Sequence, residues 1–307
     1  MSGNAFRMRL PATSANLGSG FDTAAIALDF FLEIEAESAE RFSIEATGRD
    51  SEVCSRLENN LIVSTYTNVL SQHTSEVHPL AIRMKNDIPL GMGCGSSAAG
   101  ILAATAMAAH FGKLNWSGGR ILEEACALEG HPDNAAACWV GGFVAAAMEG
   151  RSVHTVRVEP PDEWRAIVVF PGQGLRTSAA RAVLPTSYTT EQVVTNLQSV
   201  SILGLAFAQG RGDLLATAMR DRIHQPYRSG LCPLLPKLLP LAGKEGILGV
   251  ALSGAGPGVL VIVRSESEAV HACEAIKSAL SGDPACLALT RFQSSGAQQW
   301  CRAEGSE

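Results

Sequence analysis

Glycine and serine crowd one short segment of the chain, Gly91-Met92-Gly93-Cys94-Gly95-Ser96-Ser97, called the glycine loop below. The loop lies between a predicted strand, Leu80–Lys85, and an alanine-rich stretch that favours a helix. Backbone amides in such a loop can converge without obstruction from Cβ atoms, and a helix N-terminus adds partial positive charge. The pattern therefore indicates a site for an anion such as phosphate.

The glycine loop fits neither of the two commonest phosphate-binding motifs. A Walker loop ends in Gly-Lys followed by Ser or Thr, and this loop contains no lysine. A dinucleotide fingerprint requires an acidic residue about 20 positions further on to bind the ribose, and none stands there. From the loop alone, a tight packing turn before a buried helix remains the alternative.

Three other segments combine small residues with polar side chains. Pro11–Leu28 carries Asn16 and Asp22, Glu129–Phe143 begins with "EGHPDN", and Leu252–Val263 begins with "LSGAGPG". Carboxylates bind ammonium groups through charge-assisted hydrogen bonds, and Mg²⁺ takes a few carboxylate oxygens together with phosphate and water. Side chains of these types are able to bind charged groups.

The order of predicted elements indicates how these segments are positioned. The first half mixes strands and helices, with strands at Phe6–Leu10 and Phe31–Glu37 and a helix that Asn60 could cap. The second half predicts the order β-α-β-β-α-β, which is that of a ferredoxin-like sandwich. The polar tail, 293–307, is expected to be frayed.

The bulk composition excludes several classes of protein. The chain has 307 residues, 46% of them hydrophobic and 18% charged, as in a well-packed globular protein. Its net charge of -6 argues against nucleic-acid binding and against docking on an anionic membrane. The eight cysteines show no metal-binding spacing, and the N-terminus has no apolar signal segment, so a location in a reducing cytoplasm is expected.

Together, these motifs and their order resemble those of the GHMP kinases, a family of ATP-dependent small-molecule kinases. The resemblance covers most of the chain and implies an α+β fold of two domains. Residues 1–161 would form an ATP-binding, ribosomal-protein-like domain with a left-handed β-α-β unit. Residues 162–307 would form a ferredoxin-like α/β sandwich, as the strand order also predicts.

Within the family, "PATSANLGSGFD", "EGHPDN" and "DRIHQPYR" are most similar to motifs of homoserine kinases. This implies phosphorylation of the L-homoserine side-chain hydroxyl to O-phospho-L-homoserine, a step in threonine biosynthesis. Kinases for mevalonate or phosphomevalonate, and a catalytically silent homologue that binds a nucleotide or metabolite, are the alternatives. Family members often form homodimers, so a homodimer is an open alternative for this chain.

The resemblance also implies ATP and Mg²⁺ as cofactors and assigns residues to them. Ser97 and Glu129 are the expected Mg²⁺ ligands, with Glu123 and Glu124 as alternatives, and Asn134 is expected beside the reacting hydroxyl. Asn134, Ser97 and Glu129 thus form the expected catalytic set, while Asp133 receives no role. The expected nucleotide contacts are Asn60, Pro89, Leu90, Gly91, Met92, Gly93, Cys94, Gly95, Ser96, Ser97 and Ala98.

Homoserine presents an ammonium group, a carboxylate and a hydroxyl, and the motifs offer a partner for each charged group. Asn16 and Asp22 are expected to bind the ammonium group. Arg181 and Arg228 are expected to bind the carboxylate, because a forked guanidinium matches its geometry. His131 is expected to hold the substrate. The structural alternatives are a helix cap for Asp22 and solvated surface charges for the arginines.

Cys94 allows two interpretations. A thiol at a helix N-terminus near an anion site could have a lowered pKa and react with alkylating agents. Alternatively, Cys94 is an inert small residue that fills the loop.

Overall fold

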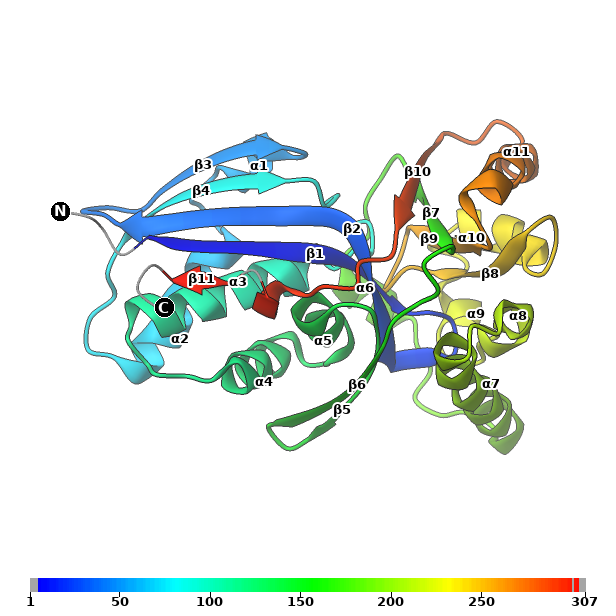
Figure 1. Cartoon of the computed structure of the whole chain (residues 1–307), viewed down its shortest axis with the longest axis horizontal. Coiled ribbons are helices and arrows are strands. Elements are labelled where there is room, and N and C mark those ends of the chain that lie inside the picture. The colour runs from blue at the N-terminus through cyan, green and yellow to red at the C-terminus, as the bar shows by residue number, and fades with distance from the viewer. Residues whose placement is uncertain (1–4, 300, 304–307) are drawn as a thin grey trace.

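The computed structural model describes residues 5–299 and 301–303, which form two β-sheets and the helices that cover them (Figure 1). The first sheet has the strand order β11-β1-β2-β4-β3, and a hairpin of β5 and β6 joins it through β2. Its strands are β1 (Phe6–Asn16), β2 (Gly20–Ser38), β3 (Ser43–Gly48), β4 (Leu80–Asn86), β5 (Phe143–Glu149), β6 (Ser152–Val158) and β11 (Arg302–Ala303).

Helices between these strands cover one face of the first sheet (Figure 1). They are α2 (Leu61–His73), α3 (Ser96–Phe111), α4 (Gly118–Glu129) and α5 (Asp133–Val140), while the short helix α1 (Ser51–Cys54) lies beside β3. Strands β3 and β4 are parallel, so α1 and α2 complete a β-α-β unit. Nearly every residue of α3 is buried, and its alanines allow the neighbouring elements to pack closely around it.

The second sheet has the strand order β10-β7-β9-β8, and all its neighbouring strands are antiparallel. Its strands are β7 (Arg165–Pro171), β8 (Ile247–Leu252), β9 (Val259–Val263) and β10 (Ala285–Arg291). In chain order this is the 4-1-3-2 arrangement expected of a ferredoxin-like sandwich, so the predicted strand order is confirmed. The α-helices of this half are α6 (Thr177–Ala182), α7 (Thr190–Ala208), α8 (Leu215–Ala218), α9 (Gln225–Arg228), α10 (Leu234–Leu238) and α11 (Glu266–Leu280). Short 3-10 turns are η1 (Gly212–Leu214), η2 (Leu239–Leu241) and η3 (Ala297–Gln299).

The prediction of a frayed tail is wrong for residues 293–299 and 301–303. The Gln293 backbone N–H donates to the Ala27 carbonyl, and the Gln293 carbonyl accepts from Gly142 N–H. Ala297 is fully buried, and β11 pairs with β1 of the first sheet. These backbone contacts hold the tail against the first sheet. The prediction was based on the polarity of the side chains, which does not reveal backbone hydrogen bonds.

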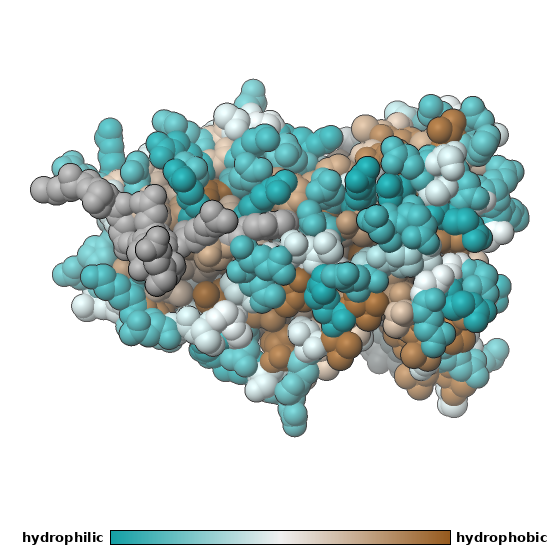
Figure 2. Space-filling model, viewed as in Figure 1, coloured by the Kyte–Doolittle hydropathy of each residue, from teal (hydrophilic) through white to brown (hydrophobic). Residues whose placement is uncertain are grey.

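The surface is mainly hydrophilic in the view of Figure 2, with hydrophobic side chains gathered at the lower right, where α7 lies. The apolar residues that α7 exposes are Val193, Val194, Leu197 and Leu205. Within residues 5–299 and 301–303, each helix is too short or too polar to span a bilayer.

Candidate active site

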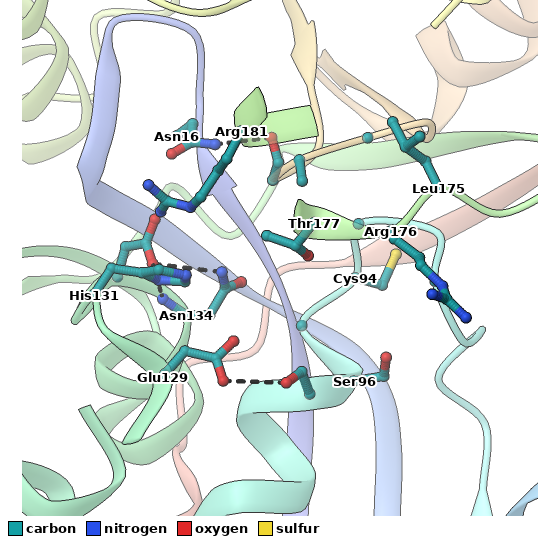
Figure 3. Close-up of a pocket in the computed structure, with 18 of the residues that line it drawn as sticks. Asn16, Cys94, Ser96, Glu129, His131, Asn134, Leu175, Arg176, Thr177 and Arg181 are labelled. Carbon is teal, nitrogen blue, oxygen red and sulfur yellow. Dashed lines mark hydrogen bonds and ion pairs between the residues drawn. The ribbon is translucent and has the colours of Figure 1, made fainter. Parts of the chain in front are cut away.

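A cavity of about 530 Å³ lies where loops of the first sheet meet loops of the second (Figure 3). It is bordered by the glycine loop, the end of α4, the start of α5, helix α6 and the turn between β8 and β9. The residues predicted for catalysis and substrate binding all line it: Asn16, Asp22, Ser97, Glu129, His131, Asn134, Arg181 and Arg228.

The glycine loop has the backbone that an anion site requires. Gly91, Gly93 and Gly95 all adopt positive φ angles, 68°, 78° and 71°, which glycine reaches without steric cost. Gly95 is the N-cap of α3, so the first N–H groups of that helix have no intrahelical acceptors and are free to bind a ligand. The Ser253 hydroxyl donates to the Gly93 carbonyl at 2.7 Å and fastens the loop to the β8–β9 turn.

Substitution of Gly93 by alanine is expected to raise the KM for ATP at least about tenfold and to destabilise the fold by about 1–3 kcal/mol. An added Cβ would lie 2.0 Å from the Ser253 carbonyl oxygen, so the loop must move. Gly91→Ala is the matched control, because φ is also positive there but the nearest atom lies 3.8 Å away. ATP kinetics and thermal unfolding measure both effects, and equal behaviour of the two variants would contradict this account of the loop.

A second cavity, of about 420 Å³, adjoins the first at Ser96 and Ser97. Its apolar lining includes Leu32, Val53, Ile62, Met84, Ile88 and Leu90, which suits a flat base. Of the other predicted nucleotide contacts, Asn60 lines this cavity, whereas Pro89, Met92 and Ala98 line neither of the two.

The Asn60 side chain is already engaged as the cap of α2. Its Oδ1 accepts from the Ile62 and Val63 N–H groups, and its Nδ2 donates to the Cys54 and Arg56 carbonyls. These bonds use both donors and both acceptor positions of the amide. The predicted cap is confirmed. The base of a nucleotide in this cavity would therefore contact Asn60 by van der Waals packing and not by a hydrogen bond.

Glu129 and Ser97 lie together at the junction of the two cavities. Helix α4 ends at Glu129 because Gly130 adopts a left-handed conformation, and Ser97 is the second residue of α3. The Ser97 hydroxyl donates to Glu129 Oε2 at 3.1 Å (Figure 3). Burial is the main reason that the pKa of Glu129 is raised. A partly buried carboxylate beside a hydroxyl and an anion site fits Mg²⁺.

The alternative metal ligands fit less well. Glu124 is buried in an ion pair with Arg120 at 2.8 Å, Glu123 lies 3.8 Å from the same guanidinium, and neither lines the cavity. Asp22, His131 and Asp133 also place ligand atoms within 4.8 Å of one another. However, hydrogen bonds within the protein already engage Asp22 and Asp133.

Asp133 holds His131 and Asn134 at the start of α5. Its Oδ1 contacts His131 Nδ1 at 2.8 Å and accepts from the Asn134 N–H at 2.7 Å. Burial lowers the pKa of His131, but the hydrogen bond and charge of Asp133 and other nearby carboxylates outweigh it, so the pKa is raised. The Thr13 hydroxyl donates to Asn134 Oδ1 at 2.7 Å and thereby fixes the amide orientation.

The predicted ligands for opposite ends of an amino acid are bonded to each other. Arg181 donates to both carboxylate oxygens of Asp22, at 2.6 and 3.0 Å. Asn16 supports Asp22 by accepting its backbone N–H at 3.0 Å, and its own Nδ2 donates to the Gly254 carbonyl at 2.8 Å.

Arg228 lines the cavity, and residues from several segments hold its side chain in place. Its side chain is buried and donates to the Ala180 and Gly254 carbonyls. His224 Nε2 lies 2.8 Å from the Gly18 carbonyl, so this nitrogen carries a hydrogen and Nδ1 is free to accept from Arg228 at 3.2 Å. Burial lowers the pKa of His224, which favours the neutral ring that this arrangement needs. Asp221 caps the turn by accepting three backbone N–H groups.

Comparisons with known proteins place this chain in a family. Residues 60–142 match the sequence model of the GHMP kinases N terminal domain, and residues 205–282 match that of the GHMP kinases C terminal. The chain is 41% identical to a homoserine kinase of Solibacter usitatus, over 89% of each chain. The chain belongs to the GHMP kinase family.

Other relatives and solved structures agree with this membership. A homoserine kinase of Synechocystis is 36% identical over 84% of this chain and 85% of the relative. The structure titled as a putative homoserine kinase from Listeria monocytogenes has a TM-score of 0.77 at 28% identity, covering 98% of this chain and 100% of that one. A mevalonate kinase of L. major, at 15% identity and a TM-score of 0.67 over 97% of each chain, shares the fold. The two-domain α+β fold predicted for a GHMP kinase is thereby confirmed.

In this GHMP kinase the hypothesis of a reactive Cys94 is wrong. Cys94 is 1% exposed, and burial raises the pKa of its thiol to about 12. The helix N-terminus lies nearby, but its field does not offset the loss of water around the sulfur.

We expect iodoacetamide at about pH 8 to leave Cys94 of the folded kinase unmodified while it modifies the exposed Cys286. Peptide mass mapping with and without ATP measures both sites in one sample. Modification of Cys94 as fast as Cys286 in the folded protein would contradict the burial of the thiol.

Several residues that line the kinase cavity were not predicted: Thr177, Ser178, Arg176, Phe21 and Ala255. Thr177 begins α6 and faces the glycine loop across the cavity (Figure 3). The Leu175 N–H donates to the Gly91 carbonyl at 3.0 Å, so this segment lies against the glycine loop. The segment "GLRTS" has no distinctive composition, and only the proximity of Arg181 along the chain could have drawn attention to it.

Proposed function

We propose that this GHMP kinase transfers the γ-phosphoryl group of ATP to the side-chain hydroxyl of L-homoserine and forms O-phospho-L-homoserine. One observation carries the proposal: among the charged side chains that line the cavity beside the glycine loop are the carboxylate of Asp22 and the guanidinium groups of Arg181 and Arg228. This set suits the two charges of an amino acid beside a nucleotide. The names of the similar kinases support the same substrate.

A mevalonate-type substrate explains the cavity less well. Mevalonate carries a carboxylate but no ammonium group, so Asp22 would have no substrate charge to bind. The glycine loop, Ser97 and Glu129 are all present in the cavity, which argues against a catalytically silent homologue.

The residues around the junction of the two cavities fit ATP and Mg²⁺. We assign the phosphates to the amides of the glycine loop and the start of α3, and the base to the second, apolar cavity. Ser97 and Glu129 would hold Mg²⁺, which neutralises charge on the phosphates when bound.

The side chains of this kinase then position the acceptor. Phosphoryl transfer depends chiefly on alignment and charge neutralisation, so the site needs no strong base. Asn134, oriented by Thr13 and Asp133, is proposed to lie beside the substrate hydroxyl, and His131, oriented by Asp133, to hold the substrate. A cytoplasmic location and a homodimer stay predictions.

Release of ADP with separate substrates tests the proposal. L-Homoserine, L-serine and mevalonate are each supplied with MgATP, and ADP is measured by a coupled assay. We expect turnover with L-homoserine and at least about 100-fold lower kcat/KM with mevalonate, which has no ammonium group for Asp22 to bind. Turnover of mevalonate without turnover of L-homoserine would contradict the proposal. ATP binding without any turnover would instead favour the silent homologue.

A further inference from the structure

The ion pair of Asp22 and Arg181 occupies the place proposed for the two charged groups of the substrate. The two residues are 159 positions apart in the sequence, and both line the cavity. Their side chains are 31% and 38% exposed, so a ligand can reach each of them. In this structure each charge is neutralised by the other.

The two partners are anchored differently. Asp22 has a positive φ of 53°, and its backbone N–H is bonded to the buried Asn16 side chain, so the carboxylate is held from the core. Arg181 lies on the six-residue helix α6, whose only buried residue is Ala180. The guanidinium on this lightly packed helix is therefore the partner that is free to move.

Phe21 keeps a second cation close to the pair. The centre of its ring lies 5.4 Å from the Arg181 guanidinium carbon and 5.3 Å from that of Arg228. Contact with one ring stabilises both guanidinium groups, and both arginines line the same cavity. If Arg181 left Asp22, it would remain beside Arg228, where two guanidinium groups could share one carboxylate.

We propose that the substrate binds by exchange of ion-pair partners. Its ammonium group replaces Arg181 at Asp22, and its carboxylate binds the released Arg181 together with Arg228. The inference rests on the proposed function. It implies that the Asp22–Arg181 pair makes the site selective for zwitterions, ligands that carry both a positive and a negative charge. A ligand with one charge would break the pair and leave the other side chain charged, partly desolvated and without a counter-ion.

Two analogues of L-homoserine separate this mechanism from simple charge attraction. γ-Hydroxybutyrate lacks the ammonium group, and homoserinol lacks the carboxylate. Binding of each to the full chain is measured by calorimetry in the presence of Mg²⁺ and a non-hydrolysable ATP analogue. For the wild type, we expect both analogues to bind at least about tenfold more weakly than L-homoserine.

The decisive results are gains of affinity in two variants. Asp22→Asn frees Arg181, so γ-hydroxybutyrate should bind about tenfold more tightly than to the wild type, while L-homoserine binds more weakly. Arg181→Gln frees Asp22, so homoserinol should bind to this variant about tenfold more tightly than to the wild type. Loss or no change of affinity for the analogue in both variants would overturn the exchange, and if one variant does not fold, the other decides.

The matched control is Asp213→Asn, which breaks the similar pair of Arg211 and Asp213 outside the cavity, with bonds of 2.7 and 2.8 Å. It should change none of the affinities, and a gain there would also overturn the exchange. Failure of the proposed function is recognised separately, because the wild type would then neither bind nor phosphorylate L-homoserine.

Discussion

Replacement of Glu129 by glutamine is expected to lower kcat by about 100-fold or more, because it removes the only carboxylate proposed to hold Mg²⁺. Glutamine keeps the size of the side chain and can still accept the hydrogen bond from Ser97, 3.1 Å away in the wild type. Steady-state ADP release over a range of Mg²⁺ concentrations measures the effect. We expect a large loss of kcat and a higher Mg²⁺ requirement.

The same substitution should not destabilise the ligand-free protein. Burial raises the pKa of Glu129 above 4.5, so the folded state binds the proton more tightly than the unfolded state does. This residue therefore reduces the free energy of unfolding as the pH rises through that raised pKa. Removal of the charge should give a thermal midpoint at neutral pH equal to or above that of the wild type.

The control for Glu129→Gln is Glu123→Gln on the same helix, which removes a carboxylate that lies outside the cavity. It should leave kcat within about twofold of the wild type. A lower kcat for Glu123→Gln than for Glu129→Gln would move the metal assignment to the other side of α4.

The second large effect is expected from Arg228→Met, which should raise the KM for L-homoserine about 100-fold and leave the KM for ATP within about twofold. Arg228 lines the same cavity as Asp22, and its guanidinium is held by the Ala180 and Gly254 carbonyls. Methionine fills a similar volume but supplies no charge for a carboxylate. Separate titrations of the two substrates measure this contrast.

The matched control is Arg222→Met, a substitution of an exposed arginine in the same segment that does not line the cavity. It should leave both KM values unchanged. If Arg228→Met raised the two KM values equally, Arg228 would be a structural residue of the cavity and not a ligand of the substrate carboxylate.

The parts of the fold and site that follow local rules could be predicted from the sequence. The glycine loop was recognisable because Gly91, Gly93 and Gly95 adopt positive φ angles, which glycine reaches far more easily than other residues do. The cap of α2 by Asn60 likewise depends on a short segment, and the strand order of the second sheet follows from the order of its helices and strands along the chain. The eight residues predicted for catalysis and substrate binding all line one cavity, and their roles there stay predictions.

Features that depend on distant contacts could not be predicted. Arg181 and Asp22 were each assigned a substrate charge, but their pairing arises only when α6 lies across the first sheet's loops. Cys94 is buried because its neighbours in the glycine loop are fastened to Ser253, and this contact spans 160 positions. The tail is ordered by backbone hydrogen bonds to β2 and to Gly142, which side-chain composition does not reveal.

One competition experiment tests the proposed function most directly. The protein is given limiting MgATP with equal concentrations of L-homoserine, L-serine and mevalonate, and the phosphorylated products are identified by mass spectrometry. We expect O-phospho-L-homoserine to be the main product, formed in proportion to the ADP released. Phosphomevalonate as the main product, or ADP released without a phosphorylated amino acid, would contradict the assignment of the cavity to homoserine.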